Sequence, residues 1–260
     1  MYEKYFSEFK NHYDSLSTKY GGSTVFNDFV KMCAISIYNT IAKNPNMEQE
    51  YLKTINSYDK EVQQIFPKMF GNLIMMFQES KDIRDVLGPF YEKINLGNKQ
   101  LGQFFTPSHI SDFMSEVTLS EDDIKAKIKE NGFISMSEPT CGAGGMILSF
   151  AKALKNHNIN YQQHLLVDAT DISETCVYMT YIQLALYGIP AVVHCGDSIS
   201  QKMRFQMETP LFFMNYWRFR QFFMTDNQES EEKDIIDNSM KKQILFNEAT
   251  IKGNCQISLW

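Results

Sequence analysis

A glycine-rich turn between residues 138 and 145 constrains the fold more than any other feature of this chain. It reads Glu138-Pro139-Thr140-Cys141-Gly142-Ala143-Gly144-Gly145, and it stands between a short apolar strand predicted at 133–136 and a buried helix predicted to open at 146–151. Glycine permits a positive φ and has no Cβ, so backbone amides can approach a nucleotide-like ligand at the positive end of the helix. A dinucleotide-binding loop would have a similar sequence, and a tight turn without a ligand is the structural alternative.

Strands and helices alternate after this turn. The sequence predicts a second buried strand at 165–171, a helix at 176–187 and a third strand at 191–195. This βαβαβ order predicts an α/β fold with a right-handed, mainly parallel sheet that binds ligands at its carboxyl edge. Asp171 ends the second strand, where a carboxylate can accept both hydroxyls of a ribose. Capping of the following helix is the competing role for Asp171, and the two roles are compatible with each other.

A second motif lies upstream, Gly102-Gln103-Phe104-Phe105-Thr106-Pro107. Together with the turn, it makes the run 101–151 resemble the amino-terminal half of an N6-adenine DNA methyltransferase, and in particular the modification subunits of type I restriction systems. The resemblance covers roughly residues 85 to 200. It implies a Rossmann-like class I methyltransferase core, S-adenosylmethionine as cofactor and a role in restriction-modification.

The resemblance and the strand order together assign the cofactor contacts. The predicted cofactor-binding residues are Phe105, Thr106, Pro107, Glu138, Cys141, Gly142, Gly144, Asp171 and Asp197. The Phe-Thr-Pro turn and the glycine loop would close around the amino-acid end of the cofactor. Asp197 follows the third strand and resembles the position that contacts the cofactor's adenine, with a simple turn aspartate as the alternative.

The chain departs from the family pattern where the catalytic residues are expected. Family members place Asn or Asp, then Pro-Pro, then Tyr or Phe after the fourth strand, so that the adenine amino group is held and the flipped base is stacked. The corresponding region, 208–217, has one proline and no Pro-Pro pair. The catalytic residues therefore stay unassigned, with Pro210, Asn215 and Tyr216 as candidates, and the short remainder of the chain favours a truncated sheet.

The predicted domains are a helical amino-terminal region at 1–100 and a cofactor-binding domain at 101–224. Apolar residues recur at helical spacing in 26–38 and in 65–77, which predicts helices that pack on one face. Hydrophobic residues make up 43% of the chain, enough for a packed core.

Charge and cysteine usage limit the partners and the location. The formal net charge of -6 argues against strong autonomous binding to duplex DNA, and we interpret the cationic spot at Lys202, Arg204, Arg218 and Arg220 as a solvated rim. The five dispersed cysteines are predicted to be reduced thiols, and no metal site is predicted. The sequence has no apolar run long enough to cross a bilayer, so we expect a cytoplasmic protein.

The carboxyl-terminal part is predicted to be an acidic linker at 225–242, followed by a tail at 243–260. The last five residues resemble the peptide by which bacterial proteins dock on the sliding clamp, with Leu259 and Trp260 as apolar anchors and Gln256 as the hydrogen-bonding group. A hairpin is the alternative for this tail.

Three functional hypotheses follow. The first is methyl transfer from S-adenosylmethionine to adenine N6 in DNA by a compact enzyme that a partner subunit completes. The second is a methyltransferase homologue that binds the cofactor but does not transfer methyl. The third is a non-enzymatic adaptor for DNA replication or the sliding clamp.

Overall fold

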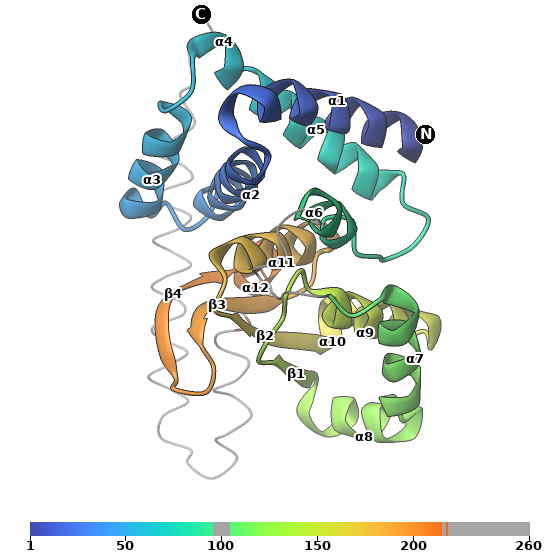
Figure 1. Cartoon of the computed structure of the whole chain (residues 1–260). Helices are drawn as coiled ribbons and strands as arrows, with labels where there is room; N and C mark the ends of the chain where they lie inside the picture. Colours follow the sequence, from blue (N-terminus) through green and yellow to red (C-terminus); the bar gives the residue numbers. More distant parts are fainter. Residues whose placement is uncertain (96–104, 215–216, 218–260) are drawn as a thin grey trace, which may run out of the picture. The chain divides into compact units, whose positions relative to one another are not determined.

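The alternation of strands and helices after residue 134 produces a four-stranded sheet in the computed structural model, which describes residues 1–95, 105–214 and 217 (Figure 1). The strands lie in chain order and are β1 (Ile134–Glu138), β2 (Leu165–Asp171), β3 (Ala191–Asp197) and β4 (Lys202–Glu208). β1, β2 and β3 are parallel, whereas β4 pairs with β3 in the antiparallel direction. The predicted α/β class with a mainly parallel sheet is confirmed.

The helices of the described residues are α1 (Tyr2–Tyr20), α2 (Gly22–Asn39), α3 (Pro45–Ile55), α4 (Lys60–Gln63), α5 (Ile65–Gln78), α6 (Gly88–Asn95), α7 (Ser108–Thr118), α8 (Glu121–Asn131), α9 (Gly145–Asn156), α10 (Tyr161–His164), α11 (Glu174–Tyr187) and α12 (Pro210–Met214). α1 to α6 form the predicted helical amino-terminal region. None of the helices in the described part of the chain combines the length and the apolar character that a membrane crossing needs.

β4 is a strand that the sequence analysis did not predict. Only the turn 198–201 separates β3 from β4, which is too short for a crossover helix, so β4 must return antiparallel. Its first three residues are exposed and two of them, Lys202 and Arg204, are charged, so the apolar signal of a buried strand is missing. Arg204, predicted to be a solvated rim residue, donates to the Glu174 carboxylate at 2.8 Å.

Helices cover the sheet on one face. Along β1, Ile134 and Met136 contribute to the main hydrophobic core, whereas Ser135 and Ser137 alternate with them and are exposed. A parallel sheet that is covered on both faces has nearly continuous apolar strands, and this strand alternates instead. Among the described residues, the second face is therefore open along β1 and at Asp168 of β2, whereas Leu166 and Thr170 of β2 are buried.

A small second cluster closes one end of that open face. Phe212 of α12 and the fully buried Trp217 pack there with Leu166 of β2. Phe133 and Val192 pack against the same cluster, and the Phe133 and Trp217 rings meet edge to face at 5.3 Å. This cluster lies at the edge where the parallel strands begin, so it leaves the carboxyl edge free.

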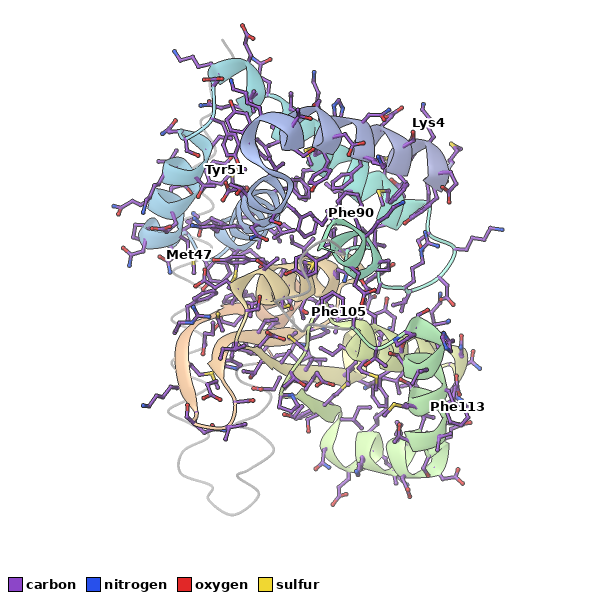
Figure 2. All side chains as sticks on the ribbon, viewed as in Figure 1. Lys4, Met47, Tyr51, Phe90, Phe105 and Phe113 are labelled. Carbon is purple, nitrogen blue, oxygen red and sulfur yellow. The ribbon has the colours of Figure 1, made fainter. Side chains whose placement is uncertain are left out.

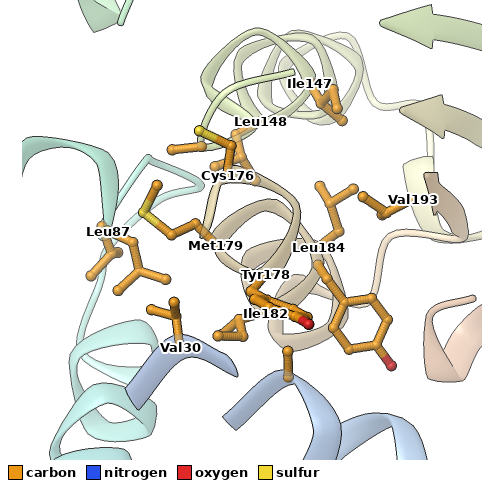
Figure 3. Close-up of a cluster of buried hydrophobic side chains, with 14 of the residues drawn as sticks. Val30, Leu87, Ile147, Leu148, Cys176, Tyr178, Met179, Ile182, Leu184 and Val193 are labelled. Atoms are coloured by element: carbon orange, nitrogen blue, oxygen red, sulfur yellow. The ribbon is translucent and has the colours of Figure 1, made fainter. Parts of the chain in front are cut away.

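α11 lies at the centre of the main core. All residues from Cys176 to Leu184 are buried, and a helix that is buried on every side must have packing partners on every side. Figure 3 shows these partners: Val30 of α2 and Leu87 on the side of the helical region, Ile147 of α9, and Val193 of β3. The helical region and the sheet therefore share one core through α11.

Residues from Met1 to Trp217 group as one unit. The predicted boundary at residues 100 and 101, the acidic linker 225–242 and the tail 243–260 lie outside the described residues. The described cysteines, Cys33, Cys141, Cys176 and Cys195, are free and buried.

An aromatic cluster around Phe90 should carry much of the stability of the helical region (Figure 2). The buried Phe90 ring of α6 lies 5.2 Å from the ring of Phe9 and 5.1 Å from that of Tyr13, both edge to face. We expect Phe90→Ala to lower the free energy of unfolding by about 3–5 kcal/mol, because it removes a buried ring and leaves a cavity. Urea denaturation followed by circular dichroism measures this loss. Phe113→Ala on α7, where the ring is 69% exposed, is the control and should change stability by less than about 0.5 kcal/mol; equal losses for the two variants would contradict the assignment.

Candidate cofactor site

The glycine loop between β1 and α9 adopts a backbone conformation that strongly favours glycine. Gly142 has φ +55° and Gly144 has φ +89°, both in the left-handed region. A Cβ at Gly144 would lie 3.2 Å from Oγ1 of Thr180, and a Cβ at Gly142 would lie 3.0 Å from the ring of Phe105. The loop is thus pressed against α11 on one side and against the Phe-Thr-Pro turn on the other.

Hydrogen bonds hold this loop in place. Oγ1 of Thr180 donates to the Gly142 carbonyl at 2.9 Å, and the Cys141 amide donates to the Thr170 carbonyl of β2 at 2.8 Å. The Cys141 side chain is buried in the main core, and this burial raises the pKa of the thiol well above its usual range. Cys141 therefore contributes a neutral, packed side chain to the loop.

Asp171 links the loop to β2 directly. The residue is 9% exposed, and its Oδ2 accepts the Gly142 amide at 2.8 Å while its Oδ1 accepts the Ser173 amide at 2.8 Å. The N-cap of α11 is Ser173, whose side chain accepts the Cys176 amide. The alternative role of Asp171 as that helix cap is therefore wrong; its carboxylate fixes the glycine loop instead. Each carboxylate oxygen retains further acceptor capacity for hydroxyl donors.

The Phe-Thr-Pro turn lies beside the glycine loop, as the resemblance implies. The Phe105 ring, labelled in Figure 2, approaches Gly142, and its centroid lies 5.7 Å from that of Tyr91. The Phe105 amide donates to Oε1 of Glu92 on α6 at 2.9 Å. Thr106 and Pro107 are exposed, and Pro107 is the N-cap of α7. The structure thus brings Phe105 and the loop together, with α6 supporting the turn.

A cleft of about 900 Å³ opens beside this turn. It is lined by the Phe-Thr-Pro turn, by the start of α9 at Gly145 and Ser149, by the start of α1 and by residues 83–93. Charges of both signs face it, including Asp85 and Lys152. The cleft does not extend to Asp171 or Asp197, so it can hold only one end of a ligand that also reaches the strand ends.

The remaining predicted acids lie at the carboxyl edge. Glu138 ends β1, and its Oε1 accepts the Thr140 amide at 3.3 Å. Asp197 ends β3, and its Oδ1 accepts the Ile199 amide at 2.9 Å while its Oδ2 accepts the Ser200 hydroxyl at 2.8 Å. These hydrogen bonds lower the pKa of Asp197. Within the chain, Asp197 therefore makes the contacts of a turn aspartate, as the alternative interpretation predicted.

Two exposed isoleucines at the same edge were missed by the sequence analysis. Ile172 follows Asp171 and is 67% exposed, and Ile199 lies two residues after Asp197 and is 94% exposed. The sequence contained a signal for them, because each is an apolar residue in the turn that follows an acid at the end of a strand. They offer apolar surface beside the carboxylates.

The catalytic candidates do not join this site within the described residues. Because β4 is antiparallel, its end at Glu208 pairs with Val192 near the start of β3. Pro210 then begins α12 at the edge opposite the glycine loop. Asn215 and Tyr216 lie outside the described residues, as do the predicted clamp-binding residues Gln256, Leu259 and Trp260.

The described residues were also compared with the ligand sets that bind metal ions. Among residues 1–95, 105–214 and 217, no group of three or more His, Cys, Asp or Glu side chains is placed to hold a metal ion.

Comparison with known proteins identifies the family. The model of the N-6 DNA methylase family matches residues 82–251, which is more than half of the chain. The chain therefore belongs to the N-6 DNA methylase family, and the resemblance stated from the two motifs is confirmed.

One similar solved structure is the methyltransferase subunit of a type I restriction-modification system from Streptococcus thermophilus, with 12% sequence identity and a TM-score of 0.37. The match covers 78% of this chain and 60% of that one, so the chain spans about 60% of the length of that subunit. Comparison with curated proteins gives no match.

Proposed function

We propose that this chain binds S-adenosylmethionine at the carboxyl edge of β1, β2 and β3 and acts in methyl transfer to adenine N6 in DNA. The observation that carries the proposal is the direct hydrogen bond from the Gly142 amide to the Asp171 carboxylate at 2.8 Å. It brings a left-handed glycine loop beside an acid at the end of the next strand, and these are the two features that bind nucleotides in doubly wound α/β folds. The family membership supports the same cofactor.

The residues at the carboxyl edge of the sheet suit the ribose, the adenine and the amino-acid end of S-adenosylmethionine. Asp171 would accept the ribose hydroxyls, and Ile172 and Ile199 would flank the adenine ring beside Asp197. The amino-acid end would pass the Phe-Thr-Pro turn into the cleft, where charges of both signs match a zwitterion. When bound, S-adenosylmethionine supplies a methyl group activated by the sulfonium; the chain's own residues bind and orient it.

Methyl transfer also requires groups that hold the target adenine. The sequence has no Asn/Asp-Pro-Pro-Tyr/Phe tetrad, and Pro210 begins a helix at the opposite edge. We therefore propose that a partner subunit contributes to adenine and DNA binding, in keeping with a net charge of -6.

The second candidate function, favoured by the same missing tetrad, is an inactive homologue that binds the cofactor and serves as an adaptor. The clamp-binding tail remains a prediction, because neither the described residues nor the comparisons support it.

Isothermal titration calorimetry with S-adenosylmethionine tests the binding site. We expect saturable one-site binding, and we expect Ile172→Ser and Ile199→Ser each to weaken it about 5–10-fold, since each removes apolar cover worth about 1–1.5 kcal/mol. Ile74→Ser on α5, where the side chain is 39% exposed, is the matched control and should leave affinity unchanged. No binding by the wild-type chain would reject the proposal.

Transfer of labelled methyl to plasmid DNA tests the activity. Incorporation of label by the purified chain would support the proposed methyltransferase activity. Incorporation only after a candidate partner is added would support the activity and also establish the need for a partner. Cofactor binding without transfer under both conditions would favour the inactive homologue.

A further inference from the structure

A fully buried glutamine connects the glycine loop to the helical region. Gln183 of α11 has 0% exposure. Its Nε2 donates to the Ala143 carbonyl of the loop at 2.7 Å and to Oδ1 of Asp85 at 2.8 Å. Its Oε1 accepts the Val86 amide at 2.7 Å and the Leu87 amide at 3.3 Å. Both donor hydrogens and both acceptor positions of the carboxamide are therefore used.

This arrangement is specific to a carboxamide at this position. α11 is mostly apolar where it faces its neighbours, so its buried polar side chains must be satisfied by defined partners, as the Thr180 hydroxyl is by the Gly142 carbonyl. Only a group with two donors and two acceptors can serve a loop carbonyl, a carboxylate and two backbone amides together. An apolar residue of the same size would leave Ala143 and residues 85–87 without these partners.

The link extends from residues 85–87 to the Phe-Thr-Pro turn. Leu87 directly precedes α6, and Glu92 of α6 accepts the Phe105 amide at 2.9 Å. Gln183 therefore holds the glycine loop directly and holds the start of the helix that positions Phe105. The positions of Gly142 and of Phe105, which lie in contact, therefore both depend on the hydrogen bonds of Gln183.

We propose that Gln183 is a positioning residue for the cofactor site, which it serves by fixing the spacing between the glycine loop and α6 without touching the cofactor. The inference rests on the proposed function for its consequence, weaker cofactor binding. Its direct consequence, an ordered loop in the free protein, does not depend on that function. Gln183 then gives the helical region a second link to the site, in addition to the hydrogen bond from the Phe105 amide to Glu92.

Two variants test the inference in the full chain. Gln183→Met keeps the approximate length and removes all four hydrogen bonds. Gln183→Asn keeps the carboxamide but is one methylene shorter, so it cannot reach both sides together and provides a milder change that preserves folding. We expect amide hydrogen exchange at Gly142 and Gly144 to be at least about tenfold faster in both variants under native conditions, and the affinity for S-adenosylmethionine to fall by at least about tenfold.

Thr209→Val is the matched control, because it removes a comparable buried polar group at the opposite edge of the sheet. Thr209 has 0% exposure, and its Oγ1 donates to the Ile189 carbonyl at 2.8 Å and accepts the Ala191 amide at 2.9 Å. This variant should lower the melting temperature while it leaves loop exchange and cofactor affinity unchanged. A general loss of stability would affect all three variants alike.

The outcomes separate the inference from the proposed function. Fast loop exchange confined to the Gln183 variants supports the positioning role. Unchanged exchange in both variants, or equal acceleration in Thr209→Val, overturns it even if the wild-type chain binds the cofactor well. If the wild-type chain binds no S-adenosylmethionine, the proposed function fails, and the exchange data alone still support or overturn the role of Gln183.

Discussion

Gly144→Asp should abolish detectable binding of S-adenosylmethionine. Gly144 is the N-cap of α9 at φ +89°, and its Cβ position points at α11, 3.2 Å from Oγ1 of Thr180. A side chain there adds backbone strain of about 1–3 kcal/mol and forces the loop away from the helix. Asp also brings a carboxylate against Thr180, which is fully buried, so the charge favours displacement toward solvent. A displaced loop loses its packing against Phe105 and its hydrogen bond to Asp171, and we expect the affinity to fall by at least about 100-fold, or about 2.7 kcal/mol.

Two further variants separate the causes of this loss. Gly144→Ala introduces the Cβ without the charge and should weaken binding less than Gly144→Asp. Gly71→Asp places the same residue in α5 where a Cβ meets nothing within 4 Å, so affinity and fold should be unaffected. Calorimetry gives the affinities, and circular dichroism with thermal melting checks that each protein is folded. If the Gly144→Asp protein is folded and binds S-adenosylmethionine with wild-type affinity, the glycine loop is not part of the cofactor site.

The strands of the parallel sheet were predictable because burial on the helical face gives them a strong local signal. The predicted bounds 165–171 are those of β2, and the third strand begins at Ala191 as predicted. α11 begins at Glu174, two residues before the prediction, because Ser173 supplies its N-cap. β4 was missed because its pairing with β3 arises from a short hairpin and its outer residues are polar and exposed.

The site was predictable where a motif specifies the backbone. Left-handed glycines and the neighbouring Phe-Thr-Pro turn follow from local sequence together with the family resemblance. The hydrogen bond between Asp171 and Gly142 depends on how β2 lies beside β1. Three of the four hydrogen bonds of Gln183 join residues nearly 100 positions apart in the sequence, and the fourth spans 40 positions. A glutamine inside a mostly apolar helix was the available signal for Gln183, but its partners belong to the tertiary structure.

Asp171→Asn should be the most damaging isosteric change at the carboxyl edge. In wild type both oxygens accept backbone amides, from Gly142 and from Ser173, each at 2.8 Å. Asn replaces one acceptor with an amino group that faces an N–H donor, so one of these two hydrogen bonds is lost, and it removes the negative charge. Because a hydrogen bond to a charged group contributes about 1.5–3 kcal/mol, stability should fall by about that amount.

Cofactor binding should fall further than stability, since the ribose hydroxyls lose their charged acceptor and the loop loses its anchor in the same variant. We expect the dissociation constant for S-adenosylmethionine to rise at least about 100-fold, from two hydrogen bonds of about 1.5 kcal/mol or more. Asp168→Asn is the control, because Asp168 is on the same strand but its side chain is 62% exposed on the open face beside His194. If both variants weaken binding equally, the effect is a loss of negative charge in general; if only Asp171→Asn does, the carboxylate at the strand end holds the nucleoside. Equal, wild-type affinity in both would place the cofactor elsewhere on the chain.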